Sequence, residues 1–228
     1  MNKLNINKRK AILDYIKKYP NIFSENEIEI ILKYTEINPE NILVPEFIRG
    51  IYDELNFLKD EENIYIGFIK LINELFDIKQ KNIVEIGGGV LPRLGERIAL
   101  FQSKGSITVY DPRLSIYKKD TSTLKLVRER FNKNIDVTPY DLLIGLMPCK
   151  AAEDIVEAAL KNRKDFVIAL CEGGVHGDEE DFYEDDEEWR RALIKYASRG
   201  VEQNNMGNLN IKYLKKYHNP YPIIYNER

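Results

Sequence analysis

Three consecutive glycines and one acidic residue form the pattern with the clearest chemical meaning in this sequence. Gly87, Gly88 and Gly89 follow the β-branched run 82–86, and Asp111 follows a second such run at 106–110. A glycine turn lets the backbone approach a ligand closely, and an acid after the neighbouring strand accepts hydrogen bonds from ribose hydroxyls. The pattern therefore predicts a site for a nucleoside-containing cofactor.

The spacing of the glycines narrows the choice of cofactor. The dinucleotide pattern G-x-G-x-x-G requires a third glycine where this chain has Pro92. That glycine permits close helix–strand packing above a pyrophosphate, so its absence disfavours NAD and FAD. No Gly-Lys-Ser/Thr follows the turn, which excludes a P-loop.

The segment Glu85-Ile-Gly-Gly-Gly89 resembles the first motif of the class I S-adenosylmethionine (SAM)-dependent methyltransferases, and the resemblance runs from about Lys81 to the C-terminus. It implies that Gly87 and Gly89 let the methionine part of SAM lie on the backbone. It also implies that Asp111 takes the two ribose hydroxyls and that Glu85 orders the turn and the amino-acid end. The cofactor-binding residues expected from it are Glu85, Gly87, Gly88, Gly89, Asp111, Pro112 and Met147.

Strands and helices alternate from residue 82 onward and would position these residues. Strands are predicted at 82–86, 106–110, within 123–131, at 141–146 and at 165–170, and helices at 91–102, 151–161 and near 186–203. Two β-like runs, 209–217 and 221–226, end the chain as an antiparallel hairpin. The fold class predicted is therefore α/β, a doubly wound Rossmann-like, mostly parallel seven-stranded sheet with an antiparallel C-terminal hairpin.

An N-terminal helical subdomain precedes this sheet. Apolar residues at helical spacing predict helices at 7–18, 25–35, 45–58 and 64–76. Ser24-Glu-Asn-Glu27 is a capping-box pattern at the start of the second of these helices. We therefore predict two domains, a helical cap over 1–78 and a SAM-binding domain over 79–228.

Ligands of parallel sheets bind at the carboxyl ends of the strands, so the residues after the fourth and fifth strands are candidates for substrate chemistry. Methylases of DNA amino groups and of protein glutamine carry Asn/Asp-Pro-Pro-Tyr/Phe after the fourth strand, whereas this chain has Met147-Pro-Cys149. That difference disfavours base and glutamine methylation. After the fifth strand, Glu172 and His176 are the predicted catalytic residues, since either could deprotonate a nucleophile.

The two cysteines, Cys149 and Cys171, end adjacent predicted strands, so we expect their side chains to be neighbours. No C-x-x-C or H-x-x-x-H spacing accompanies them, and no metal site is predicted. Two cysteines in 228 residues make no disulfide framework and fit a reducing compartment. The sequence has no apolar run of membrane-spanning length and no apolar signal core near Met1, so we expect a cytoplasmic protein.

The distribution of charge indicates which kind of acceptor substrate the chain would bind. The formal net charge is −3, and nine of the eleven residues 178–188 are acidic. Such a block is typically solvated, and it can also attract a cationic substrate and repel nucleic acid. We therefore expect a small-molecule or peptide acceptor and no nucleic acid, although the Lys- and Arg-rich N-terminal helices leave contact with phosphate as an alternative. The oligomeric state stays open.

Three functional hypotheses remain. The first is a SAM-dependent methyltransferase acting on a small molecule or peptide. The second comes from Gly87-Gly-Gly-Val-Leu-Pro92, which is similar to the Gly-Ser-Gly-Pro-Leu-Pro turn of nicotianamine synthase-like enzymes and implies transfer of the 3-amino-3-carboxypropyl arm of SAM. The third is a non-catalytic SAM-fold binding module, motivated by the missing motif after the fourth strand.

Overall fold

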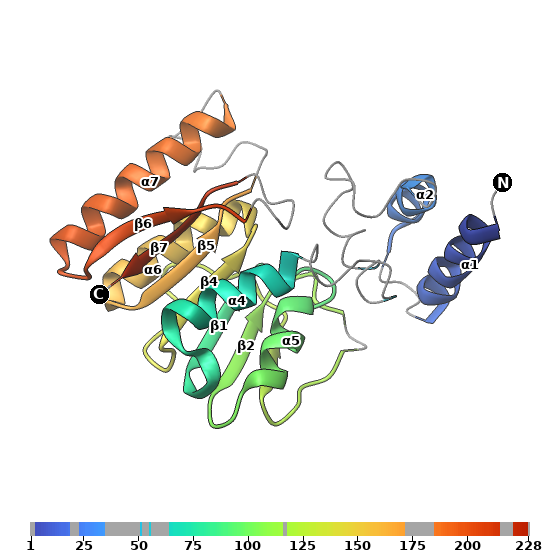
Figure 1. Cartoon of the computed structure of the whole chain (residues 1–228), viewed down its shortest axis with the longest axis horizontal. Helices are drawn as coiled ribbons and strands as arrows, with labels where there is room; N and C mark the ends of the chain where they lie inside the picture. The colour runs from blue at the N-terminus through green and yellow to red at the C-terminus, as the bar shows by residue number, and fades with distance from the viewer. Residues whose placement is uncertain are drawn as a thin grey trace.

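Seven strands form one mixed sheet in the order β3-β2-β1-β4-β5-β7-β6 (Figure 1). The computed structural model describes residues 3–18, 23–34, 51, 55, 64–115, 118–171, 185–214 and 221–227. Strands β1 to β5 pair in parallel, and β7 is antiparallel to both of its neighbours. The strand bounds are β1 Asn82–Ile86, β2 Ser106–Tyr110, β3 Leu124–Val127, β4 Leu142–Leu146, β5 Asp165–Ala169, β6 Asn208–Lys212 and β7 Ile223–Glu227.

The strand order places a topological switch point between β1 and β4. From β1 the chain continues outward to β2 and β3, and it then returns to the other side of β1 for β4 and β5. Ile86 pairs with Tyr110, so Gly87 and Asp111 leave the sheet at the same level. In open sheets of this kind ligands bind in the crevice outside the carboxyl ends of the strands at the switch point.

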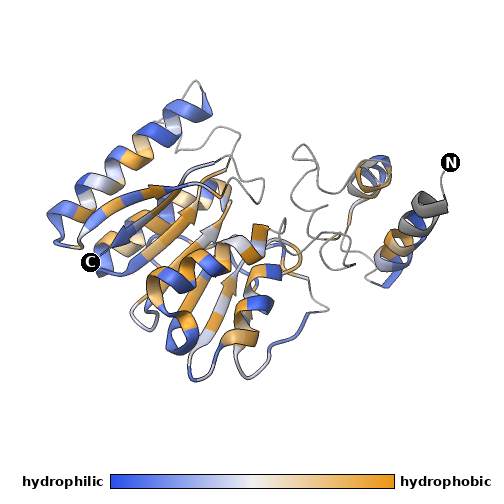
Figure 2. Ribbon diagram, viewed as in Figure 1, coloured by the Kyte–Doolittle hydropathy of each residue, from blue (hydrophilic) through white to orange (hydrophobic). Residues whose placement is uncertain are grey.

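Four helices cover the two faces of the sheet (Figure 1). The bounds are α4 Ile64–Phe76, α5 Arg93–Phe101, α6 Ala152–Asn162 and α7 Asp186–Gln203. Successive strand residues point to opposite faces, so Ile83 packs in the core beneath α4 and α5, whereas Val84 packs in the core beneath α6 and α7. Figure 2 shows apolar residues concentrated on the strands and polar residues on the outer helix surfaces, as two buried faces require.

Helices α1 (Lys3–Lys18) and α2 (Glu25–Tyr34) lie apart from those four helices and enclose a core of their own (Figure 1). Among the residues that the structure describes, its buried members are Ile12, Tyr15, Phe23, Ile31 and Ile51. Leu91, from the segment after the glycine turn, packs against this small core and joins it to the sheet. The predicted helix 45–58 lies outside the described residues apart from positions 51 and 55.

The predicted fold class is confirmed, and several predicted bounds agree with the structure. The helix at 64–76 and the strands at 82–86 and 106–110 are as predicted, whereas α5 begins at Arg93, two residues late, because Pro92 occupies its N-cap. Of the predicted β-like run 209–217, residues 215–217 lie outside the described residues. The division at residue 78 stays a prediction, although α4, which it assigns to the cap, packs against the sheet. None of the helices in the described ranges combines the length and apolar character needed to cross a membrane.

Candidate cofactor-binding site

The turn after β1 is held by hydrogen bonds from its own backbone to β2. The Gly87 N–H donates to the Tyr110 carbonyl oxygen at 2.9 Å, and the Gly89 N–H donates to Asp111 Oδ2 at 2.9 Å. Gly87 and Gly89 have φ values of 83° and 69°, a region that side chains with a Cβ rarely adopt. The glycines therefore allow the chain to turn back over the end of the sheet with backbone facing outward.

The Asp111 carboxylate builds this turn and keeps capacity for a ligand. Its Oδ2 accepts from Gly89, and its Oδ1 accepts from the Arg113 backbone N–H at 2.8 Å. Each carboxylate oxygen has two acceptor positions, so one backbone donor on each oxygen leaves room for a vicinal diol. The half-buried carboxylate thus keeps acceptor positions on both oxygens.

Glu85, the last residue but one of β1, is a buried carboxyl group facing the same space. Its Oε2 atom has no hydrogen-bond partner among the described residues. The pKa of Glu85 is raised to about 8, chiefly by burial and to a smaller extent by the charges of Asp111 and Glu96, while a hydrogen bond from the Gly95 backbone acts in the opposite direction. A buried carboxyl group that lines a cavity suits a ligand with an ammonium group, because that charge would favour ionised Glu85.

A cavity of about 370 Å³ lies over the glycine turn at the switch point. It lies within the size range of small-ligand pockets. Six of the seven predicted cofactor-binding residues line it, and Pro112, which is exposed beside Asp111, does not. The lining members of the predicted set are Glu85, Gly87, Gly88, Gly89, Asp111 and Met147.

The segment after β4 forms the opposite wall of the cavity. Met147 and Cys149 both have positive φ, 53° and 49°, and Pro148 between them is buried. A Cβ on Gly87 would lie 2.9 Å from the Pro148 Cα, so the two walls touch at the base of the cavity. Non-glycine residues in left-handed conformations cost energy and cluster at functional sites, which supports a binding role for this rim.

The two thiols are neighbours, as predicted, but they are not alike. Cys149 is exposed, whereas Cys171 is buried. A hydrogen bond with Cys149 and burial raise the pKa of the Cys171 thiol, so that thiol stays protonated at neutral pH. Within the described ranges, no three His, Cys, Asp or Glu side chains gather as metal ligands.

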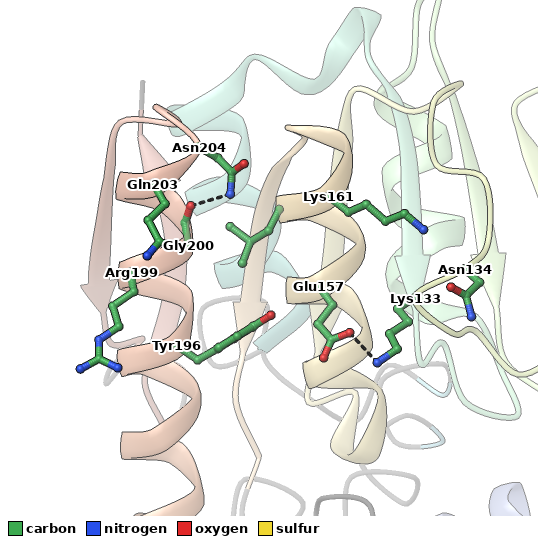
Figure 3. A pocket seen from close by; sticks show the side chains of 10 residues that line it. Lys133, Asn134, Glu157, Lys161, Tyr196, Arg199, Gly200, Gln203 and Asn204 are labelled. Atoms are coloured by element: carbon green, nitrogen blue, oxygen red, sulfur yellow. Dashed lines mark hydrogen bonds and ion pairs between the residues drawn. The ribbon is translucent and has the colours of Figure 1, made fainter.

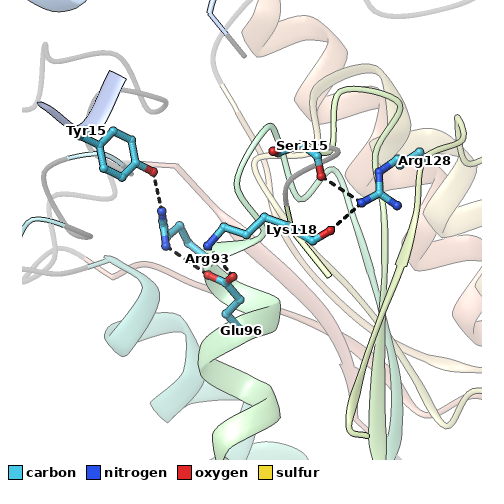
Figure 4. Close-up of polar contacts among 6 residues, drawn as sticks. All are labelled: Tyr15, Arg93, Glu96, Ser115, Lys118 and Arg128. Carbon is cyan, nitrogen blue, oxygen red and sulfur yellow. Dashed lines mark hydrogen bonds and ion pairs between the residues drawn. The ribbon is translucent and has the colours of Figure 1, made fainter. Parts of the chain in front are cut away.

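Arg93 lines the cavity and is the main site residue that the sequence pattern did not reveal. Its Nη2 donates to the Tyr15 hydroxyl at 2.9 Å, and its Nη1 pairs with Glu96 Oε2 at 3.1 Å (Figure 4). Glu96 Oε1 in turn pairs with Lys118 Nζ at 2.8 Å. Phe23 also lines the cavity, so the N-terminal helices contribute to the site directly and through Arg93.

The predicted catalytic residues, Glu172 and His176, lie outside the described residues. Residues 185–188, the part of the acidic block that the structure describes, form the N-terminal end of α7. The Asp185 side chain accepts a hydrogen bond from the Glu188 N–H at 2.6 Å, and three further acids occupy the first turn of the helix. Acidic groups at this end are favoured by the helix dipole.

A second hollow, of about 580 Å³, lies between α6 and α7 (Figure 3). Its charged groups include Lys133 and Glu157, which pair with each other at 2.9 Å. Leu160 packs so closely beneath Gly200 that a Cβ there would approach its Cδ1 to 2.2 Å. This hollow is therefore a seam between two packed helices, and it shares no residue with the cavity over the glycine turn.

No family model and no curated protein matches this chain. Among solved structures, it is similar to the Aeropyrum pernix fibrillarin with natively bound SAM, at 12% identity over 73% of this chain and 75% of that chain, with a TM-score of 0.48. A mutant of MtNAS in complex with SAM matches at 12% identity over 88% and 72%, with a TM-score of 0.48. The Synechocystis PCC 6803 magnesium protoporphyrin IX methyltransferase with bound SAM matches at 9% identity over 97% of each chain, with a TM-score of 0.47. At these identities the likeness is one of fold alone.

Proposed function

We propose that this chain is a SAM-dependent transferase, and specifically a methyltransferase that acts on a small molecule or a peptide. One observation carries the proposal: the buried carboxyl of Glu85, the positive-φ turn at Gly87 and Gly89, and the Asp111 carboxylate converge on one cavity at the switch point of the sheet. When bound, SAM supplies an electrophilic methyl group on a sulfonium.

The residues around the cavity fit the parts of that cofactor. Asp111 would hold the ribose hydroxyls, for which it keeps acceptor positions. Glu85, which lines the cavity, would pair with the ammonium of the amino-acid end, and that positive charge would favour the ionised carboxylate. The site offers no third glycine and no Gly-Lys-Ser/Thr for a pyrophosphate. Methyl transfer then depends on holding the acceptor in line with the methyl group.

Glu172 and His176 are the proposed general bases. Both follow Cys171, and β5 ends two residues before Cys171, at the same edge of the sheet as the cavity. The acidic block 178–188 supports a cationic or amine acceptor over a nucleic acid, because its field attracts positive charge. An amine of this kind needs a base, since it is protonated at neutral pH and must lose a proton before attack.

Calorimetric titration with SAM and with S-adenosylhomocysteine tests the cofactor. We expect micromolar binding that Asp111→Ala weakens by about 100-fold, because the variant loses both ribose acceptors. Asp141→Ala is the matched control: its Oδ2 accepts a hydrogen bond from the Asn82 N–H at 2.8 Å, at the opposite edge of the sheet. Absence of binding by the unmodified chain would refute the proposal.

Transfer of the 3-amino-3-carboxypropyl arm is the alternative enzymatic proposal, supported by the turn Gly87-Gly-Gly-Val-Leu-Pro92. The product distinguishes the two reactions. Methyl transfer leaves S-adenosylhomocysteine, and arm transfer leaves methylthioadenosine. Incubation of the chain with SAM and a panel of amines, followed by separation of the nucleosides, would show which accumulates. SAM binding with neither product formed from any acceptor would favour the non-catalytic module.

A further inference from the structure

A hydrogen bond joins the N-terminal helices to the cofactor cavity through one side chain. Arg93 opens α5, lines the cavity and is buried. Its Nη2 donates to the hydroxyl of Tyr15, which lies on α1 in the small core of the N-terminal helices (Figure 4). The Tyr15 ring is buried as well, so the hydroxyl is held in place by the packing around it.

Arg93 belongs to a group of charged side chains beside the cavity. Glu96 pairs with both Arg93 and Lys118. Lys118 is itself fixed, because its backbone carbonyl accepts a hydrogen bond from Arg128 Nη2 at 2.8 Å (Figure 4). Screening by water is weak at buried groups, so an anionic ligand group near Arg93 would be attracted strongly.

The cavity therefore presents two kinds of charge to a ligand. The Glu85 carboxyl lines it and suits an ammonium, and the Arg93 guanidinium lines it and suits a carboxylate. An α-amino acid carries both groups on one carbon. A guanidinium has five N–H donors in a planar fork, so it can bind a carboxylate while keeping protein partners.

We infer that Arg93 is the subsite for the carboxylate of the amino-acid end of the cofactor and that Tyr15 is a positioning residue that sets its orientation. This inference rests on the proposed function. It makes the N-terminal helices part of cofactor recognition, since α1 supplies the hydroxyl that holds the guanidinium. It also predicts that the chain distinguishes SAM from an otherwise identical ligand that lacks the carboxylate.

The test compares SAM with decarboxylated SAM, which keeps the sulfonium, the ribose and the ammonium. Both dissociation constants are measured by calorimetry for the unmodified chain, Tyr15→Phe, Arg93→Gln and Ile12→Val. We expect the unmodified chain to prefer SAM by about 30-fold, a typical value for a charge-assisted contact. Arg93→Gln should abolish the preference, and Tyr15→Phe should reduce it by about 5- to 10-fold.

Ile12→Val is the control for the packing of α1, because Ile12 is fully buried beside Tyr15 in the same small core. It should leave the ratio of the two dissociation constants unchanged. Since both ligands meet the same folded chain, the ratio is independent of any loss of stability. Equal weakening of both ligands by Tyr15→Phe, or no preference in the unmodified chain, would overturn the inference and leave the proposed function standing. Binding of neither ligand would refute both.

Discussion

The Asp111 carboxylate accepts a hydrogen bond from the backbone N–H of Gly89 at 2.9 Å, and this contact joins the end of β2 to the turn that follows β1. The residue expected to bind the ribose therefore also supports the turn on which the methionine part would lie. Substitution of Asp111 should lower both the stability of the chain and its affinity for the ligand. Denaturation without ligand measures the first effect, and calorimetric titration measures the second.

We predict that Asp111→Ala lowers the free energy of unfolding by about 1–2 kcal/mol, because the Gly89 and Arg113 N–H groups lose their acceptor. Urea denaturation of the chain without ligand measures this change. Asp141→Ala should cost a smaller or similar amount, since its partner Asn82 is exposed. No loss of stability in Asp111→Ala would mean that these hydrogen bonds contribute nothing to the folded turn.

Two adjacent glycines should both lose stability on substitution by alanine, but for different reasons. A Cβ on Gly88 would lie 2.3 Å from Val109 Cγ1, so Gly88→Ala should cost about 1–3 kcal/mol through overpacking. A Cβ on Gly89 meets nothing within 4 Å, and the cost there is about 1–2 kcal/mol for a positive φ of 69°. Gly88 and Gly89 both line the cavity, so both variants should also weaken SAM binding, which calorimetric titration measures.

The Gly88 contact can be checked by a double substitution. Val109→Ala removes the methyl group that a Cβ on Gly88 would meet. The loss of stability in Gly88→Ala, Val109→Ala should therefore be smaller than the sum of the two single losses. Additive losses would show that the turn moves away from Val109 instead of clashing with it.

Stability should fall with rising pH because of Glu85. The pKa of Glu85 is about 8 in the folded chain, against an ordinary value of 4.5, so between these pH values the folded state holds a proton that the unfolded state has released. Each pH unit in this window lowers the free energy of unfolding by up to about 1.4 kcal/mol. The stabilisation relative to an always-ionised carboxylate is complete below pH 4.5 and lost above pH 8.

Glu85→Gln removes this titration. Urea denaturation from pH 5 to pH 9 gives the free energy of unfolding of the unmodified chain and of Glu85→Gln. The difference, unmodified chain minus variant, should decline up to about pH 8 and then level off. A difference that does not change with pH would contradict a raised pKa. If Glu85 also meets the ligand ammonium, SAM binding at pH 7 should release about one proton per site, a value that calorimetry in two buffers detects.

A buried amide should be essential to the other half of the sheet. Asn226 in β7 is fully buried, its Oδ1 accepts from the Phe166 N–H at 2.8 Å, and its Nδ2 donates to Asp165 Oδ1 at 2.9 Å. Asn226→Leu should cost about 2–4 kcal/mol in urea denaturation, since a β5 donor and a carboxylate lose their partner. Asn208→Leu on the exposed edge strand is the control, and a comparable loss there would refute the specific role of Asn226.

The local pattern predicted the strands and the helices well because each carries its own signal. The β-branched run 82–86 and the apolar spacing of 64–76 define their elements without reference to the rest of the chain. The glycine turn and Asp111 were predicted together because parallel strands in register end at one level. Such information is available from a single stretch of residues.

Arg93 and Tyr15 were missed because their relationship is tertiary. They are 78 positions apart, and Arg93 in the sequence resembles any basic residue in the first turn of an amphipathic helix. The orphaned oxygen of Glu85 and the left-handed Met147 and Cys149 are likewise properties of the folded chain. No propensity or spacing rule distinguishes these residues from ordinary ones.

Because Tyr15 contacts Arg93, binding of a ligand in the cavity should in turn affect the docking of α1. Tyr15 belongs to the buried core of the N-terminal helices, and its hydroxyl accepts a hydrogen bond from Arg93 at the cavity. Thermodynamic coupling is reciprocal, so a ligand that favours one orientation of Arg93 favours the docking of α1 by the same free energy. Amide hydrogen exchange in α1 should therefore slow when the cavity is filled, which would make the N-terminus a reporter of occupancy.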